Sequence, residues 1–167
     1  MLYFCIMQFS ENSRVWIYQA DRQLNEDETQ RIQAQLDAFA ANWTAHNNAL
    51  KAKAEVRYNR FLILIVDESQ AGASGCSIDK SVHVMKDIEQ EFNINLFDRF
   101  NLAYRDGEEI LSAPRAQFEE LIKQQNINAH TTVFNNTIQT LADLHTKWEV
   151  PFKDSWHQQL FGSLLNN

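Results

Sequence analysis

The residues best suited to chemistry lie in one polar loop, DESQAGASGCS at 67–77, which follows an apolar run and precedes a helical pattern. Cys76 falls at the expected start of that helix, where free N–H groups and the helix dipole stabilise a thiolate. Asp67 ends the apolar run, and a carboxylate there could bind a metal, position a base or cap the loop. We therefore take Cys76 as the candidate nucleophile, with Asp67 or a histidine assisting.

The same loop could instead bind an anion or a nucleotide without hydrolysing it. Two of the four glycines, Gly72 and Gly75, lie here, so the backbone can turn tightly and present several N–H groups. The candidate ligand-binding residues are Ser74, Gly75, Ser77 and Lys80. Small polar residues at a strand-to-helix turn are also common helix caps, and this is the alternative interpretation of the loop.

The five histidines show no spacing that is typical of a metal site. No H-x-x-x-H, H-x-H or C-x-x-C pattern occurs, and we therefore expect no metal and no cofactor. Cys76, His46 and Asp67 have the residue types of a thiol triad, but their spacing adds no support. After a long helix, His46 is more typical of a C-terminal cap.

The composition is that of one soluble domain. The 167 residues are 44% hydrophobic and include eleven Phe and four Trp, enough for a single core. The net charge of −7 disfavours nucleic acid and anionic membranes, which are bound through clustered Lys and Arg. The apolar start at 2–7 has no preceding basic residue and is much shorter than the ~20 residues of a membrane span. We expect a cytoplasmic protein without a signal peptide.

Hydrophobic patterns predict the main strands and helices. FLILIV at 61–66 indicates a strand that is covered on both faces, in the middle of a sheet. KAEVRY at 53–58 alternates and predicts a strand near an edge, and Val15 to Tyr18 predict another strand. Apolar residues at helical spacing predict one helix that starts after Asn25 and ends near His46.

Capping and turn residues add further boundaries. Ser77 or Asp79 is expected to cap a second helix that continues to Phe92. Asn59-Arg60 predicts a turn between two strands, with one long bent strand as the alternative, and Asp106-Gly107 is a stronger hairpin signal. Pro114 suits the first turn of a third helix.

The last third of the chain is predicted to mix short strands and helices. Thr131 to Phe134 resemble a strand, and Asn136 is expected to cap a short helix. At 148–161, WEVPFKDSWHQQLF brings aromatic residues together; most belong in a core, although they could also contact a partner. The opening residues 1–9 could form an edge strand or a docked tail.

These elements predict an α+β fold. Their order mixes hairpins with helices, which favours a single domain over 1–167 with a mixed, mostly antiparallel sheet and helices mainly on one face.

Several stretches resemble a family of small bacterial proteins of unassigned activity that carry the label ABC transporter ATPase. The resemblance covers about Ser10 to Phe161 and rests on SRVWIYQADRQLNEDE, WTAHN, YNRFLILIVDES, GCSIDKSV, VFNN and WEVPFKDSWHQQLF. The label implies ATP hydrolysis, whereas a Walker A loop requires G-x-x-x-x-G-K-[ST]. Here no glycine precedes a lysine, and no LSGGQ-like signature occurs. We predict a binding or protein-interaction module without P-loop hydrolysis, for a protein partner or a small anionic ligand; a Cys76-dependent enzyme or redox protein is the alternative.

Overall fold

The computed structural model describes residues 8–166, so that most of the opening segment considered above lies outside it. The fold is α+β, as the sequence predicts, and every paired strand in the described part is antiparallel. A three-stranded sheet has the order β1-β5-β4, with β1 at Arg14–Gln19, β5 at Phe61–Asp67 and β4 at Lys51–Arg57. A four-stranded sheet has the order β7-β6-β8-β9, with bounds Glu109–Pro114, Asn101–Asp106, Thr132–Phe134 and Glu149–Pro151. The expected single sheet is thus divided, because the strands after α2 pair among themselves.

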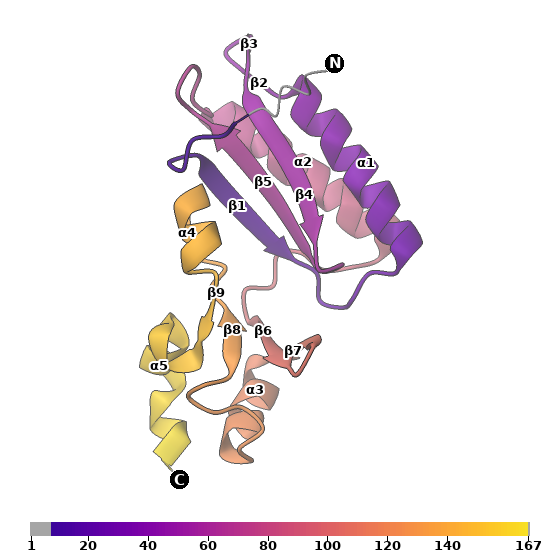
Figure 1. Ribbon diagram of the computed structural model, residues 1–167. Coiled ribbons are helices and arrows are strands. Elements are labelled where there is room, and N and C mark those ends of the chain that lie inside the picture. Colours follow the sequence, from indigo (N-terminus) through magenta and orange to yellow (C-terminus); the bar gives the residue numbers. More distant parts are fainter. Residues whose placement is uncertain (1–7, 167) are drawn as a thin grey trace, which may run out of the picture.

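Helices cover both sheets (Figure 1). Helices α1 (Glu26–Asn42) and α2 (Gly75–Phe92) lie on one face of the first sheet. The short helix α4 (Leu141–Thr146) lies against its other face, beside β1. Helices α3 (Arg115–Lys123) and α5 (Trp156–Phe161) pack on the second sheet. A small hairpin of β2 (Thr44–Ala45) and β3 (Asn48–Ala49) follows α1, and 3₁₀ turns at Phe152–Asp154 and Gly162–Asn166 flank α5.

Strand β5 is the centre of the fold, as its six apolar residues predict. Its alternate residues Leu62, Leu64 and Val66 pack under α1 and α2. Phe61, Ile63 and Ile65 point to the opposite face, where they meet α4 and the second sheet. Strand β5 is therefore buried on both faces, and β4 is an edge strand as predicted.

Local signals placed α1 correctly and α2 approximately. Asn25 caps α1, and Glu28 returns the bond to the Asn25 N–H in a capping box. Helix α2 is capped by Ser74, three residues before the predicted Ser77 and five before Asp79. Ser77 instead occupies the third helical position and completes a reciprocal pair with Ser74.

Two other cap predictions were wrong. His46 does not cap α1, which ends at Asn42 with Trp43 as its C-cap; His46 lies at the β2–β3 turn with a φ of 51°. Asn136 does not cap α4, which begins after Thr140. Helix α1 ends before the β2–β3 hairpin, which places His46 in that hairpin's turn. Asn136 lies in the turn at 135–138, which precedes the cap residue Thr140.

The predicted hairpins are present. Strands β4 and β5 are joined by a three-residue loop, in which Tyr58 and Asn59 adopt φ values of 55° and 52°. The β6–β7 turn contains Gly107 with a φ of 60°. Pro114 precedes the first residue of α3 and thus occupies its N-cap position, one residue before the first turn.

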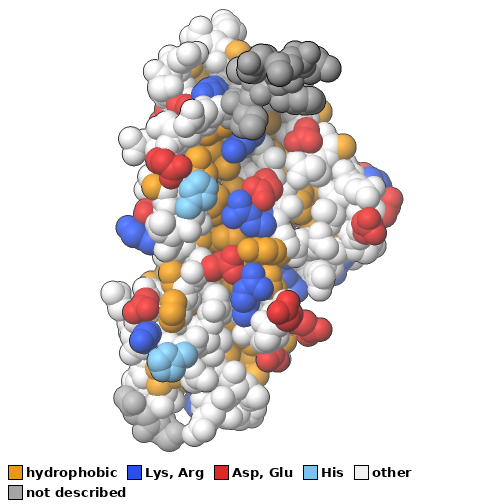
Figure 2. Space-filling view, in the orientation of Figure 1, with side chains coloured by type: hydrophobic (Ala, Val, Ile, Leu, Met, Phe, Trp, Pro, Cys, Tyr) orange, Lys and Arg blue, Asp and Glu red, His pale blue; other side chains and the backbone are white. Residues whose placement is uncertain are grey.

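An aromatic cluster joins the two sheets. Tyr58 stacks on Trp148 with ring centroids 5.9 Å apart, and the Phe61 ring lies 4.9 Å from Trp148. Glu149 accepts bonds from the Tyr58 hydroxyl at 2.6 Å and from Arg105 at 2.7 Å, and its bond to the phenol raises the pKa of Tyr58. Figure 2 shows oppositely charged side chains gathered around apolar ones at the middle of this face.

No helix within residues 8–166 is both long enough and apolar enough to cross a bilayer.

Candidate functional site

The loop residues singled out from the sequence mainly build the start of α2. Ser77 donates its N–H to the Ser74 hydroxyl, and its own hydroxyl accepts from the Ser74 N–H at 2.7 Å. Cys76 is exposed at the second position of the helix. Gly75 and Lys80 are also exposed, and a Cβ added at Gly75 would meet no atom within 4 Å. The two serines are thus fully engaged in capping, whereas Cys76, Gly75 and Lys80 face solvent.

Asp67 is buried and holds the chain that leads into β1. Its carboxylate accepts from the N–H groups of Ser10 and Ser69, at 3.1 and 3.0 Å, and pairs with Lys51 at 3.2 Å. The bond from the Ser69 side chain, followed by those from the two N–H groups, lowers the pKa of Asp67. The carboxylate therefore has structural partners of its own, and none of them is Cys76.

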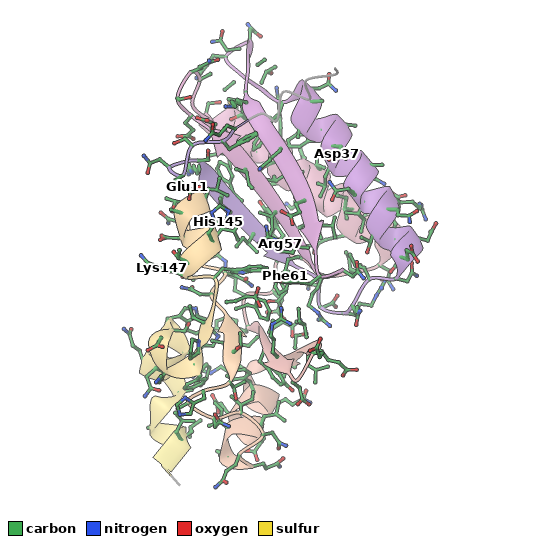
Figure 3. The ribbon with its side chains drawn as sticks, in the orientation of Figure 1. Glu11, Asp37, Arg57, Phe61, His145 and Lys147 are labelled. Atoms are coloured by element: carbon green, nitrogen blue, oxygen red, sulfur yellow. The ribbon has the colours of Figure 1, made fainter. Side chains whose placement is uncertain are left out.

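The histidines do not gather around these residues. His46 is exposed at its turn, and His157 is buried in the second core beside Phe118 and Phe152. His145 on α4 lies beside Glu11 on the protein surface, with Nδ1 3.3 Å from the carboxylate (Figure 3). Within residues 8–166, no three His, Cys, Asp or Glu side chains form a group that could hold a metal ion.

A cleft runs along the outer edge of β1. Its volume is about 570 Å³, which falls in the range of about 300–1,000 Å³ that is typical of ligand pockets. The walls are formed by β1, by Val82 of α2, by residues 96–103, by residues 134–139 and by Trp156. Segments far apart in the sequence therefore meet at this one strand.

The backbone of β1 alternates between two partners. Ala20 donates its N–H to Arg60, on the side of β5, whereas Val15 donates to Gln139 on the opposite side. Ser13 likewise accepts from Leu141 on that outer side. Because alternate residues of a strand direct their N–H and C=O groups to the same side, the odd-numbered residues of β1 face outward, into the cleft.

Beyond Val15, no strand among residues 8–166 neighbours this outer edge. The bridge between Arg14 and Thr140 ends where the chain turns at 135–138. Within residues 8–166, no backbone or side-chain group bonds to the outward N–H or C=O of Ile17. The edge of β4 differs, because the Gln33 amide of α1 donates to the C=O of Ala54 and accepts from the N–H of Val56.

A polar network fixes the end of the cleft nearest the second sheet. The Gln19 amide donates to the C=O of Asn101 at 2.8 Å and accepts from Asn136 at 2.9 Å. Asn136 in turn accepts from the Trp148 indole at 2.9 Å. These bonds satisfy the buried amides and hold residues 101 and 136 at a fixed distance from β1.

Exposed apolar side chains lie at the cleft or next to it. Phe97 lines the cleft, is 39% exposed and packs edge-on against Tyr18 with centroids 5.5 Å apart. Phe100, three residues later, is 61% exposed. Large apolar side chains that remain exposed beside a cavity are typical of interaction sites.

Three charged side chains line the cleft. Arg14 lies over the Trp16 ring at 4.7 Å and contacts Glu68 at 3.7 Å, with both side chains well exposed. Arg99 has no carboxylate partner among the described residues. The carboxylate of Asp98 accepts the Phe100 N–H at 2.9 Å and so helps to fold its own loop. Arg99 is therefore the cation of the cleft that remains without a carboxylate partner among residues 8–166.

Sequence reasoning missed nearly all of this site. Among the predicted candidates, only Trp156 of the aromatic C-terminal segment lines the cleft, and most of the other aromatic residues of that segment are buried in cores. A local signal did exist in LFDRFN at 96–101, where two Phe and an Arg share a loop between a helix and a strand.

Comparison of the chain with models of protein families, with curated proteins and with solved structures found no match in any of the three.

Proposed function

We propose that this protein is a cytoplasmic binding or protein-interaction module, without P-loop ATP hydrolysis, whose ligand occupies the cleft at β1. The observation that supports this proposal most directly is the combination of a cavity of about 570 Å³ with an unpaired strand edge and the exposed Phe97. Exposed strand edges favour association with another chain and are usually covered. An uncovered edge inside a cleft therefore supports a binding role.

The test is to fill the cleft from α2. Val82 lines the cavity, and the next residue, His83, is exposed on the same helix. We expect Val82→Trp to abolish binding and His83→Trp, the matched control, to retain it.

The probes are a random dodecapeptide phage library, nucleotides, inorganic phosphate, acyl compounds and divalent metals. Phage enrichment detects peptides, and thermal unfolding detects the others, because a ligand at one hundred times its Kd adds about 2.7 kcal/mol to stability. Failure of every probe, or binding that Val82→Trp leaves intact, would overturn the assignment of the cleft.

A second candidate is a thiol-dependent enzyme or redox protein that uses Cys76. Its support is the exposure of Cys76 in the first turn of α2. Asp67 is engaged with Ser10, Ser69 and Lys51, and an assisting base would have to come from another residue. The rate at which iodoacetamide modifies native Cys76 at pH 7 tests this candidate; a rate equal to that of free cysteine would count against it.

A third candidate is an anion or a nucleotide held by the N–H groups around Gly75, without hydrolysis. Gly75 is exposed with open space around it. Stabilisation by phosphate compounds that Gly75→Val removes, and that Val82→Trp leaves unchanged, would support this candidate over the cleft.

A further inference from the structure

We infer that the ligand of the cleft is an extended polypeptide segment, apolar in its middle and acidic beside it, that adds to the edge of β1 as a fourth strand. This inference rests on the proposed function and specifies its ligand. It would make the protein a module that recognises peptides by β-strand addition.

The first step concerns backbone hydrogen bonds. Residues 139–141 already pair with the start of β1 through Ser13 and Val15, in the antiparallel sense. The pairing then stops, although β1 continues to Gln19. The outward N–H and C=O of Ile17 remain in the cleft as one donor and one acceptor, the pair that a neighbouring antiparallel strand uses.

The second step concerns space. At about 3.3 Å per residue, the stretch of β1 from Val15 to Gln19 accommodates a partner strand of about four residues. The chain turns away from this stretch at Asn135, whose carboxamide accepts from both the N–H and the hydroxyl of Thr137. The cavity begins where the chain turns away from β1. An added strand would therefore continue along β1 from the point at which residues 139–141 stop pairing with it.

The third step concerns side chains. Successive residues of an added strand point to opposite faces of the sheet. On one face they would meet Tyr18, Phe97 and Val82, and on the other Ile17 and Phe134. Because both walls are apolar, the middle of the ligand must be apolar at consecutive positions.

The fourth step concerns charge. The chain as a whole carries −7, and the cleft is lined by Arg14, Arg99 and the carboxylate of Asp98, which already accepts the Phe100 N–H. Arg14 starts β1 and is paired with Glu68, whereas Arg99, close to Asn101 at the other end, has no carboxylate partner among the described residues. An acidic residue beside the apolar stretch would complement Arg99.

A second copy of the chain fits this edge less well than a peptide. Pairing two β1 strands about a twofold axis requires the whole edge of each, whereas residues 139–141 already cover its start. Residues 96–99 and Trp156 also wall the open part. A narrow, walled edge therefore favours a single extended segment.

The deciding variant is Ile17→Pro. Proline removes the outward N–H of β1 and shortens the side chain, whereas the N–H and C=O groups that pair with β5 belong to the neighbouring residues. Proline is tolerated on an edge strand at such a position. Ile17→Ala is the matched control, because it shortens the same side chain and keeps the N–H. Circular dichroism and urea unfolding confirm that both variants fold.

The probe is a random dodecapeptide phage library panned on the full chain, with the enriched peptides then synthesised and titrated. We expect them to contain apolar runs with Asp or Glu nearby. Ile17→Pro should weaken their binding at least about five-fold relative to Ile17→Ala, which is the effect of one lost hydrogen bond. Arg99→Glu should weaken it about ten-fold at low salt and less at high salt.

Several results would overturn the inference. Equal affinity for Ile17→Pro and Ile17→Ala, combined with loss in Val82→Trp, would refute strand addition while leaving a ligand in the cleft. Binding that is indifferent to Val82→Trp would refute both proposals. A dimer at micromolar concentration that Ile17→Pro dissociates would show that a second copy takes this edge.

Discussion

His157, which is buried in the core of the second sheet, makes the free energy of unfolding depend on pH. His157 is completely buried, its Nδ1 lies 2.8 Å from the Ser155 hydroxyl, and its Nε2 has no hydrogen-bond partner in the structure. Its ring stacks on Trp156 with centroids 3.8 Å apart. Burial lowers the pKa of His157 from 6.5 to about 4, because the charged imidazolium would lose its hydration.

The direction and size of the effect follow from linkage. Between pH 7 and pH 5 the unfolded chain takes up a proton at His157, whereas the folded chain does not. Because the unfolded state binds more protons in this window, the free energy of unfolding falls as the pH falls. Integration over the window gives a loss of about 2 kcal/mol, and the loss continues until the folded-state pKa of about 4 is reached.

The variant that isolates this effect replaces both polar partners with apolar ones, His157→Phe with Ser155→Ala. Removing both members of a buried hydrogen bond costs little when the shape is kept. We expect wild-type protein to lose about 2 kcal/mol more than the variant between pH 7 and pH 5. Urea unfolding at pH 5, 6 and 7, followed by tryptophan fluorescence, measures the difference.

The same pH dependence in both proteins would refute the reasoning, because it would mean that His157 keeps its ordinary affinity for protons in the folded state. Because both proteins contain the other four histidines, their contributions to the pH dependence cancel in the comparison. The window also lies above the range in which Glu28 titrates, where the bond from Arg22, followed by that from the Asn25 N–H, lowers the pKa of Glu28 to about 2.

Three further substitutions test the fold. Gln33→Leu leaves two backbone groups of β4 unpaired and should lower the free energy of unfolding by about 1–3 kcal/mol, whereas Gln30→Leu, at an exposed position of the same helix, should change it by less than about 0.5 kcal/mol. Asn25→Ala removes the α1 cap and should cost about 1 kcal/mol by the same urea titration, so that an unchanged midpoint would contradict its role. Leu64→Ala leaves a cavity in the core under α1. It should lower the free energy of unfolding, measured by calorimetry, by about 2–5 kcal/mol, or prevent folding.

The elements of this fold could be predicted because their signals are local. The unbroken apolar run at 61–66 predicts a strand with two covered faces, and the apolar spacing after Asn25 predicts a helix. Both exist at nearly the predicted bounds. The division into separate sheets could not be predicted in this way, because it depends on which strands pair. Pairs such as Tyr104 of β6 with Val133 of β8 join segments that no local pattern connects.

The candidate site could not be predicted for a related reason. The loop at 67–77 attracted attention because thiols, carboxylates and glycines have recognisable chemistry, yet its serines are engaged in capping and Asp67 in anchoring Ser10. The cleft is made instead of backbone groups and apolar side chains from segments that include 14–19, 96–103 and 134–139. None of these segments contains a recognised sequence motif, and they form a possible binding site only when the fold places them side by side.

The two edges of the first sheet give the strongest argument that the cleft has a purpose. A bare edge invites unwanted pairing, and proteins therefore cover or disrupt it. On strand β4 the Gln33 amide bonds to the C=O of Ala54 and the N–H of Val56, as a neighbouring strand would. The start of β1 is covered by residues 139–141. No described residue pairs with the stretch around Ile17, which lies in the cleft between residues 96–99 and Trp156. We infer that these residues leave space for one extended segment and prevent a second sheet from pairing edge to edge. An edge that is protected against sheets and still accessible to a single strand is the arrangement that selective peptide binding requires.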